Sequence, residues 1–132
     1  MVVAAYTALR GLQCLPNGVG GVAMSLDFLH KQVQRDFVTK MGFPSWFPTA
    51  LGLYKLTQLA LNWVAGGAYV PYSQFMMALQ LGGAAFAHVV AEKKGFTPAA
   101  LGAPCFFLST TIAIQTLHGS LGLMPSIAIF AC

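Results

Sequence analysis

Charge is what this chain has least of. Of its 132 residues, only 8% are Asp, Glu, Lys or Arg, whereas 57% are hydrophobic. Soluble domains usually carry about 25% charged residues, so this chain has too few to cover a surface that faces water. We therefore expect hydrocarbon rather than water to surround most of the protein.

Acidic residues are the scarcest of the charged types. The three are Asp27, Asp36 and Glu92, which leaves little for acid–base catalysis. The sequence also lacks HExxH, GxSxG, GxGxxG, CxxC and a phosphate-binding loop. We predict that the chain is not an enzyme. Its basic residues form no run interleaved with aromatics, so nucleic-acid binding is excluded as well.

Cysteines are few and far apart. Cys14, Cys105 and Cys132 show neither metal-ligand nor redox-motif spacing, so we predict small buried or lipid-facing thiols and no metal site. The N-terminus has no basic region followed by a small-residue cleavage site, so we expect no secretory signal.

What the chain does have is long apolar segments. Four candidate spans cover residues 2–34, 46–65, 71–93 and 98–118, and the last three hold roughly the 20 residues that cross a hydrocarbon core. "LPNGVGG" (Leu15 to Gly21) predicts a kink in the first span, because Pro16 removes a helical hydrogen bond. The connections are short, so consecutive helices should be antiparallel neighbours.

The sequence therefore predicts an all-α fold, a four-helix transmembrane bundle with short loops in a single integral membrane domain, 1–132. A short apolar C-terminal tail, "GSLGLMPSIAIFAC", follows His118. Pro125 interrupts this tail, which is too short to span. We expect it to lie along the interface or to pack on another subunit.

The loop charges predict an orientation. Residues 30–45 carry Lys31, Arg35 and Lys40, and the loop after the third span carries Lys93 and Lys94. The positive-inside rule places both loops on the cytoplasmic, stromal or matrix side and both termini on the other. The aromatic residues expected at the interfaces are Trp46, Trp63, Tyr69 and Tyr72.

Lys55 lies within the second span, about 13 Å from its start at the helical rise. An ammonium group near the midplane costs about 3 kcal/mol on insertion scales. Three interpretations are open: the lysine snorkels to an interface, pairs inside the bundle, or faces a ligand or water pocket. The pairing candidate is Asp27, which we expect at a similar depth on the first span.

Several other polar residues occur at helical spacing. Lys55, Gln58 and Asn62 share one face at i, i+3 and i+7. The other two spans offer further polar or small residues: Gln80, Ala84 and His88, and Thr111, Gln115 and His118. Hydrogen bonding between helices that fixes their register is our first interpretation. The alternative is a polar pocket at the bundle centre for a quinone, lipid or pigment.

The histidines have two interpretations each. His30 belongs to the basic loop and is expected to be solvated. His88 and His118 are expected to form hydrogen bonds, but in a photosynthetic assembly either could ligate a chlorophyll magnesium, because imidazole nitrogen binds metals well.

About half of the chain resembles the DoxX-like family of four-helix membrane proteins. The similar stretches are "KMGFPSWFPTALGLYKLTQLAL" and "FMMALQLGGAAFAHVVAEKKG". The family's "GFP" entrance corresponds to Gly42–Pro44, and the small residues before a histidine correspond to Ala84–His88. The second helix of the family commonly carries Glu, where this chain has Lys55. The resemblance implies a four-helix bundle, often with a partner, as in quinone-linked oxidoreductase systems or membrane assembly factors.

Three functions follow as hypotheses. The first is a non-catalytic small subunit of a larger membrane complex of photosynthetic or respiratory electron transport, which packs against other subunits and membrane lipid and binds lipid or pigment. The second is a quinone-linked oxidoreductase component with a site at Lys55, Gln58, Asn62 and His88. The third is a membrane chaperone or lipophile carrier. We expect the thylakoid or the mitochondrial inner membrane.

Overall fold

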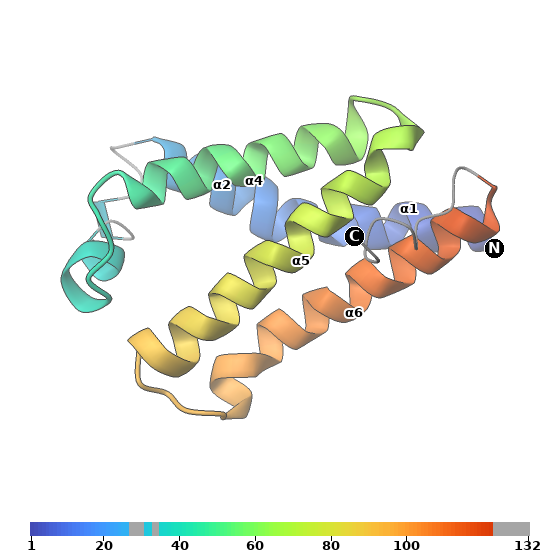
Figure 1. Ribbon diagram of the computed structural model, residues 1–132. Coiled ribbons are helices and arrows are strands. Elements are labelled where there is room, and N and C mark those ends of the chain that lie inside the picture. The colour runs from blue at the N-terminus through green and yellow to red at the C-terminus, as the bar shows by residue number, and fades with distance from the viewer. Residues whose placement is uncertain (27–30, 33–34, 123–132) are drawn as a thin grey trace.

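The computed structural model describes residues 1–26, 31–32 and 35–122 (Figure 1). Every regular element in these residues is a helix, which confirms the predicted all-α class. The α-helices are α1 (Val2–Leu12), α2 (Gly20–Ser25), α4 (Phe47–Trp63), α5 (Val70–Phe86) and α6 (Pro98–Ser120). Shorter turns of other helix types are η1 (Leu15–Val19), η2 (Asp36–Lys40), η3 (Gly67–Tyr69) and η4 (Ala87–Ala91).

The predicted kink in the first segment takes the form of a π-turn. Helix α1 ends at Leu12, and η1 carries Pro16 at its second position before α2 begins. Proline has no N–H to donate, so the backbone widens here instead of continuing the α-helical hydrogen-bond pattern. The backbone stays in the right-handed helical region through Gln13, Cys14 and Val19, so the segment is one kinked helix with a π-helical turn inside it.

Helix α2 packs very closely on α4. A side chain at Gly52 of α4 would lie 2.8 Å from the backbone nitrogen of Ser25 and 2.9 Å from the carbonyl oxygen of Gly21. The backbones can approach this far only because both contact positions are glycine. Glycine at 52 thus determines how deeply α4 lies against the first segment.

Helices α5 and α6 lie side by side and antiparallel (Figure 1). Thr97 caps α6, accepting a bond from the Ala100 N–H at 3.3 Å. Among the described residues, the two helical stretches long and apolar enough to cross a membrane are Gly67–Ala91 and Pro98–Ser120. Helix α4 has 17 residues, about 25 Å at the helical rise, and it contains several polar side chains.

The connections gather at two ends of the molecule. Turn η2 and the α5–α6 connection lie at one end, and η3 and the N-terminus lie at the other (Figure 1). Helices α4 and α5 are joined through η3, and about halfway along α4 the Tyr54 hydroxyl donates to the Met76 carbonyl of α5 at 2.8 Å. From there they diverge toward the lysine-rich end (Figure 1).

The distribution of polar and apolar side chains is inverted relative to a soluble protein. The fully buried side chains of the described residues are largely amides and hydroxyls, whereas leucine, phenylalanine and isoleucine side chains of α4, α5 and α6 are exposed. In water, burying amides and exposing large apolar groups would both be unfavourable. A small apolar cluster of Tyr6, Val70 and Ile114 lies near the N-terminal end of the bundle.

Candidate functional site

Two features could carry function: a polar interior and an apolar cavity. The interior is a set of buried hydrogen-bonding side chains contributed by every long helical segment. Its fully or nearly fully buried members are Gln13, Asn17, Gln58, Asn62, Ser73, Gln74, Thr110, Thr111, Gln115 and His118.

The centre of the polar interior is a reciprocal amide pair. Gln13 donates to Gln74 at 2.8 Å, and Gln74 donates back to Gln13 at 2.9 Å. Gln13 also donates to the Thr111 hydroxyl at 3.1 Å. These bonds join the first segment to α5 and α6, so the network fixes their mutual register.

Arg10 holds one end of this network. Its guanidinium lies 5.1 Å from the centre of the Tyr6 ring and 4.4 Å from the Trp63 ring, a double cation–π contact. Its Nε donates to the Asn62 side chain at 3.1 Å, and a terminal nitrogen donates to the Asn62 carbonyl. Arg10 therefore joins the first segment to the end of α4.

His118 is fully buried beside the same end. Its Nδ1 lies 2.8 Å from the Tyr6 hydroxyl, while its Nε2 is buried without a partner among the described residues. The enclosed position leaves no open face for a chlorophyll macrocycle. In this structure His118 is a hydrogen-bonding residue of the interior.

The cavity lies where α4 and α5 diverge. It has a volume of about 680 Å³, within the range of about 300–1,000 Å³ typical of small-molecule sites. Phe43 and Phe47 stack at 4.4 Å on one wall, with Phe37 beside them. Gly83 and Ala84 form part of the α5 wall, so little side-chain volume fills the space.

Lys55 lines the inner part of this cavity. Its Nζ donates to the Pro16 carbonyl at 3.3 Å, and Gly20 lies close beside it. The lysine thus satisfies a backbone acceptor at the π-turn. Gln80 also lines the cavity, and its Oε1 is buried with no hydrogen-bond partner in the described part of the chain. The inner end therefore combines an ammonium donor with an amide, whereas the walls are aromatic and aliphatic.

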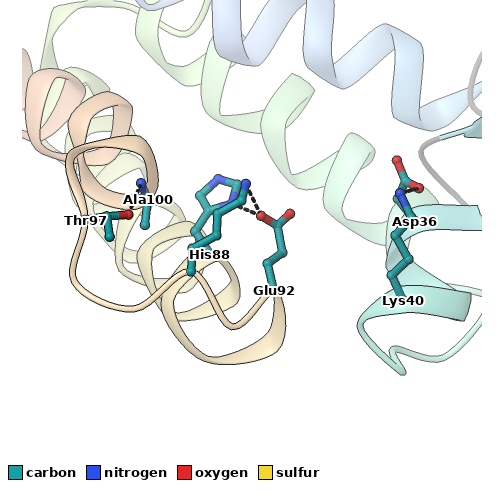
Figure 2. A network of polar contacts seen from close by, with 7 residues as sticks. Asp36, Lys40, His88, Glu92, Thr97 and Ala100 are labelled. Carbon is teal, nitrogen blue, oxygen red and sulfur yellow. Dashed lines mark hydrogen bonds and ion pairs between the residues drawn. The ribbon is translucent and has the colours of Figure 1, made fainter.

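Three titratable side chains line the cavity at the lysine-rich end: Asp36, His88 and Glu92. Figure 2 shows Asp36 beside Lys40 and, apart from them, His88 beside Glu92. His88 Nδ1 lies 3.0 Å from the Glu92 carboxylate, which also pairs with Lys94. The hydrogen bond from Lys94 has the largest effect and that from His88 the next, and both lower the pKa of Glu92 below its ordinary value. On η2, Lys40 lies 2.7 Å from Asp36, and this bond lowers the pKa of Asp36. Both carboxylates are therefore ionised at neutral pH.

The residues predicted to share one polar face of α4 are divided between the two features. Lys55 reaches the cavity and the π-turn. Gln58 is bound to Ser73 at 2.9 Å, and Asn62 to Arg10, so both belong to the buried network. The predicted partner of Lys55, Asp27, lies outside the described residues, as does His30, and the Asp27–Lys55 pair stays a prediction.

The two candidate histidines lie at opposite ends of the molecule. His88 lies in η4 beside the cavity, and His118 lies in the last turns of α6. No group of three or more metal-ligating side chains gathers within residues 1–26, 31–32 and 35–122.

Sequence reasoning missed the polar face of the first segment. Tyr6, Arg10, Gln13 and Asn17 follow one another at spacings of four, three and four, which a helix places on one side. All four take part in the interior network. The 4-3-4 spacing is present in the sequence, with Pro16 lying inside it between Gln13 and Asn17.

Comparison with family models, with curated proteins and with solved structures finds no match to this chain.

Proposed function

We propose that the chain is an integral membrane protein in which four helical segments cross the bilayer. The inverted burial supports this proposal, because lipid tolerates exposed apolar side chains and penalises unpaired polar ones. Trp46 at one end and Trp63 and Tyr69 at the other are exposed, as interfacial aromatics are. The resemblance to the DoxX-like family and the placement of the lysine-rich loops on the cytoplasmic, stromal or matrix side remain part of this proposal.

The function that the geometry supports best is the holding of an amphiphilic molecule by a small, non-catalytic membrane subunit. The observation that carries it is the apolar cavity of about 680 Å³ between α4 and α5. Aromatic walls suit a hydrocarbon chain, and the charged residues at the lysine-rich end suit a polar head. Association with other subunits of an electron-transport complex in the thylakoid or mitochondrial inner membrane fits the same role.

A quinone-linked component is the second candidate. It is favoured by Lys55 in the cavity, because an ammonium group can donate a hydrogen bond to a quinone carbonyl. His88 lines the same cavity and could contact the ring or its substituents. Gln58 and Asn62 are already bonded within the interior, so they are not part of this version of the site.

Filling the cavity tests the proposal. Gly83 lines the cavity, and a Cβ there would meet nothing within 4 Å. Gly83→Leu should therefore fold normally, with helix propensity improved by about 1 kcal/mol, while its side chain occupies ligand space. Gly82 has equal room but does not line the cavity, so Gly82→Leu is the matched control.

The measurement is native mass spectrometry of the three proteins purified in mild detergent, with absorbance spectra of solvent extracts. We expect the wild type and Gly82→Leu to carry an amphiphile, and Gly83→Leu to bind it about tenfold more weakly, a loss of about 1.4 kcal/mol, and so to be recovered with less of it. A reducible quinone in the extract would favour the second candidate. Equal occupancy in all three proteins would show that the cavity is not the site.

A further inference from the structure

A second cavity, of about 570 Å³, adjoins the first at its charged end. Its lining is almost entirely charged and comes from η2 and the end of η4: Asp36, Lys40, Ala91, Glu92, Lys93 and Lys94. Asp36 and Glu92 line both cavities. We call this second space the polar cavity, because all of its lining residues except Ala91 are charged. It adjoins the apolar cavity, which is the arrangement needed for a molecule with a hydrocarbon chain and a charged head.

The charges of the polar cavity do not cancel. Lys40 is paired with Asp36 (Figure 2), and Lys94 is paired with Glu92. The Lys93 side chain is exposed and forms no hydrogen bond or ion pair within the part of the chain that the structure describes. One positive charge thus remains for a ligand, and a single negative charge would complement it.

The backbone at Lys93 is unusual as well. Its φ is +56°, the left-handed conformation that follows many helix ends and normally favours glycine. A lysine there carries strain that glycine would not. Strained residues of this kind often occur at ligand sites, where the side chain is needed in that direction.

The apolar cavity has an open side toward the surroundings of α5. Leu79 and Phe86 line it, yet 57% and 59% of their surface is exposed. In a bilayer these exposed side chains face lipid tails. An acyl chain could therefore enter sideways from the membrane while its headgroup stays at the lysine-rich surface.

We propose that the two cavities together bind an anionic phospholipid, with one acyl chain between α4 and α5 and its phosphodiester at Lys93. This inference rests on the proposed amphiphile-binding function and names the ligand class. A phosphodiester headgroup such as that of phosphatidylglycerol carries one negative charge and no cation. Phosphatidylcholine would bring its own cation close to three lysines, so the site should discriminate against it.

The test exploits the strain at Lys93. Lys93→Gly removes the charge and suits the left-handed backbone, so thermal stability should stay equal or rise. Lys93→Arg keeps the charge. Lys31 is exposed and lines neither cavity. The sequence predicts that it lies on the same side of the membrane as Lys93, so Lys31→Ala is the control for net charge.

Each protein is exchanged into nanodiscs made from an equimolar mixture of phosphatidylglycerol and phosphatidylcholine. Tightly bound lipid is then counted by native mass spectrometry after gentle release. We expect phosphatidylglycerol to be enriched in the wild type, Lys93→Arg and Lys31→Ala. Lys93→Gly should reduce the enrichment about fivefold, the factor expected for one basic residue at an anionic surface. Added inorganic phosphate should not displace the lipid.

The outcomes separate this inference from the proposed function. If Lys93→Gly leaves the enrichment unchanged while Gly83→Leu abolishes lipid binding, the cavity holds an amphiphile but Lys93 does not select its head. Displacement by inorganic phosphate would assign the polar cavity to a free anion and overturn the phospholipid. If neither substitution changes the bound lipid, both proposals are wrong.

Discussion

At the scale of single residues, Arg10 combines two kinds of contact, cation–π stacking and hydrogen bonding. Two aromatic rings enclose its guanidinium, and the Asn62 side chain and carbonyl accept its hydrogen bonds. A planar guanidinium can stack and donate in a fork, whereas an ammonium group cannot do both. The side chain therefore acts as a cross-link between the first segment and the end of α4.

We expect Arg10→Lys to lower the free energy of unfolding by about 1–2 kcal/mol, because the stacking and one or more hydrogen bonds are lost. Arg35 is exposed, so Arg35→Lys should change it by less than about 0.5 kcal/mol. Thermal unfolding in one detergent, followed by circular dichroism, would compare the two. Equal shifts in both variants would argue against the cross-link.

Lys55 shows what residue-scale reasoning could and could not predict. Its spacing predicted an inward-facing position, and the structure places it against the Pro16 carbonyl and the cavity. The acceptor could not be foreseen, because it depends on the π-turn, whose wide geometry is a property of the backbone. Asp27 lies outside the described residues, so its pairing with Lys55 stays a prediction.

At the scale of elements, the contact between α2 and α4 depends on one glycine. A Cβ at Gly52 would lie 2.5 Å from the Ser25 hydroxyl as well as against the α2 backbone. Distances this short cannot be relieved by a side-chain rotation alone, so the helices must separate. The polar contacts of α4 with the first segment would then lengthen.

We predict that Gly52→Ala destabilises the protein by about 2–3 kcal/mol through this overpacking. Gly102 in α6 has open space around a would-be Cβ, so Gly102→Ala should be neutral or stabilising by up to about 1 kcal/mol. The two variants undergo the same chemical change in helices, and their unfolding temperatures give the comparison. A Gly52→Ala protein as stable as the Gly102→Ala protein would contradict the close contact.

At the scale of the whole molecule, composition and periodicity predicted the all-α class and the approximate ranges of α4, α5 and α6. Proline and glycine at the ends of these segments mark helix starts and stops, which is why the helices begin close to the expected residues. The cavity could not be predicted, because it arises from the angle at which α4 and α5 diverge. That angle depends on packing among several helices at once.

The hydrogen-bond partners within the interior network also depend on how several helices pack together. Individual glutamines and threonines at helical spacing could be recognised in the sequence, but their partners could not. The Gln13–Gln74 pair joins residues 61 positions apart, and only the assembled bundle brings them together. Sequence spacing therefore identified the polar faces of α4 and α6, and the three-dimensional arrangement determined which amide meets which.

The polar face of α4 has a consequence for how the protein is made. During synthesis the first segment and α4 leave the ribosome before α5 and α6, yet Gln13 and Gln58 lack their partners until Gln74 and Ser73 of α5 arrive. An isolated helix with such a face enters a translocon poorly. We expect nascent chains that end at Gly66 to remain extractable by alkaline carbonate, whereas chains that reach Gly122 integrate. If the shorter chains resist extraction equally well, the first segment and α4 integrate without α5 and α6, and the prediction is wrong.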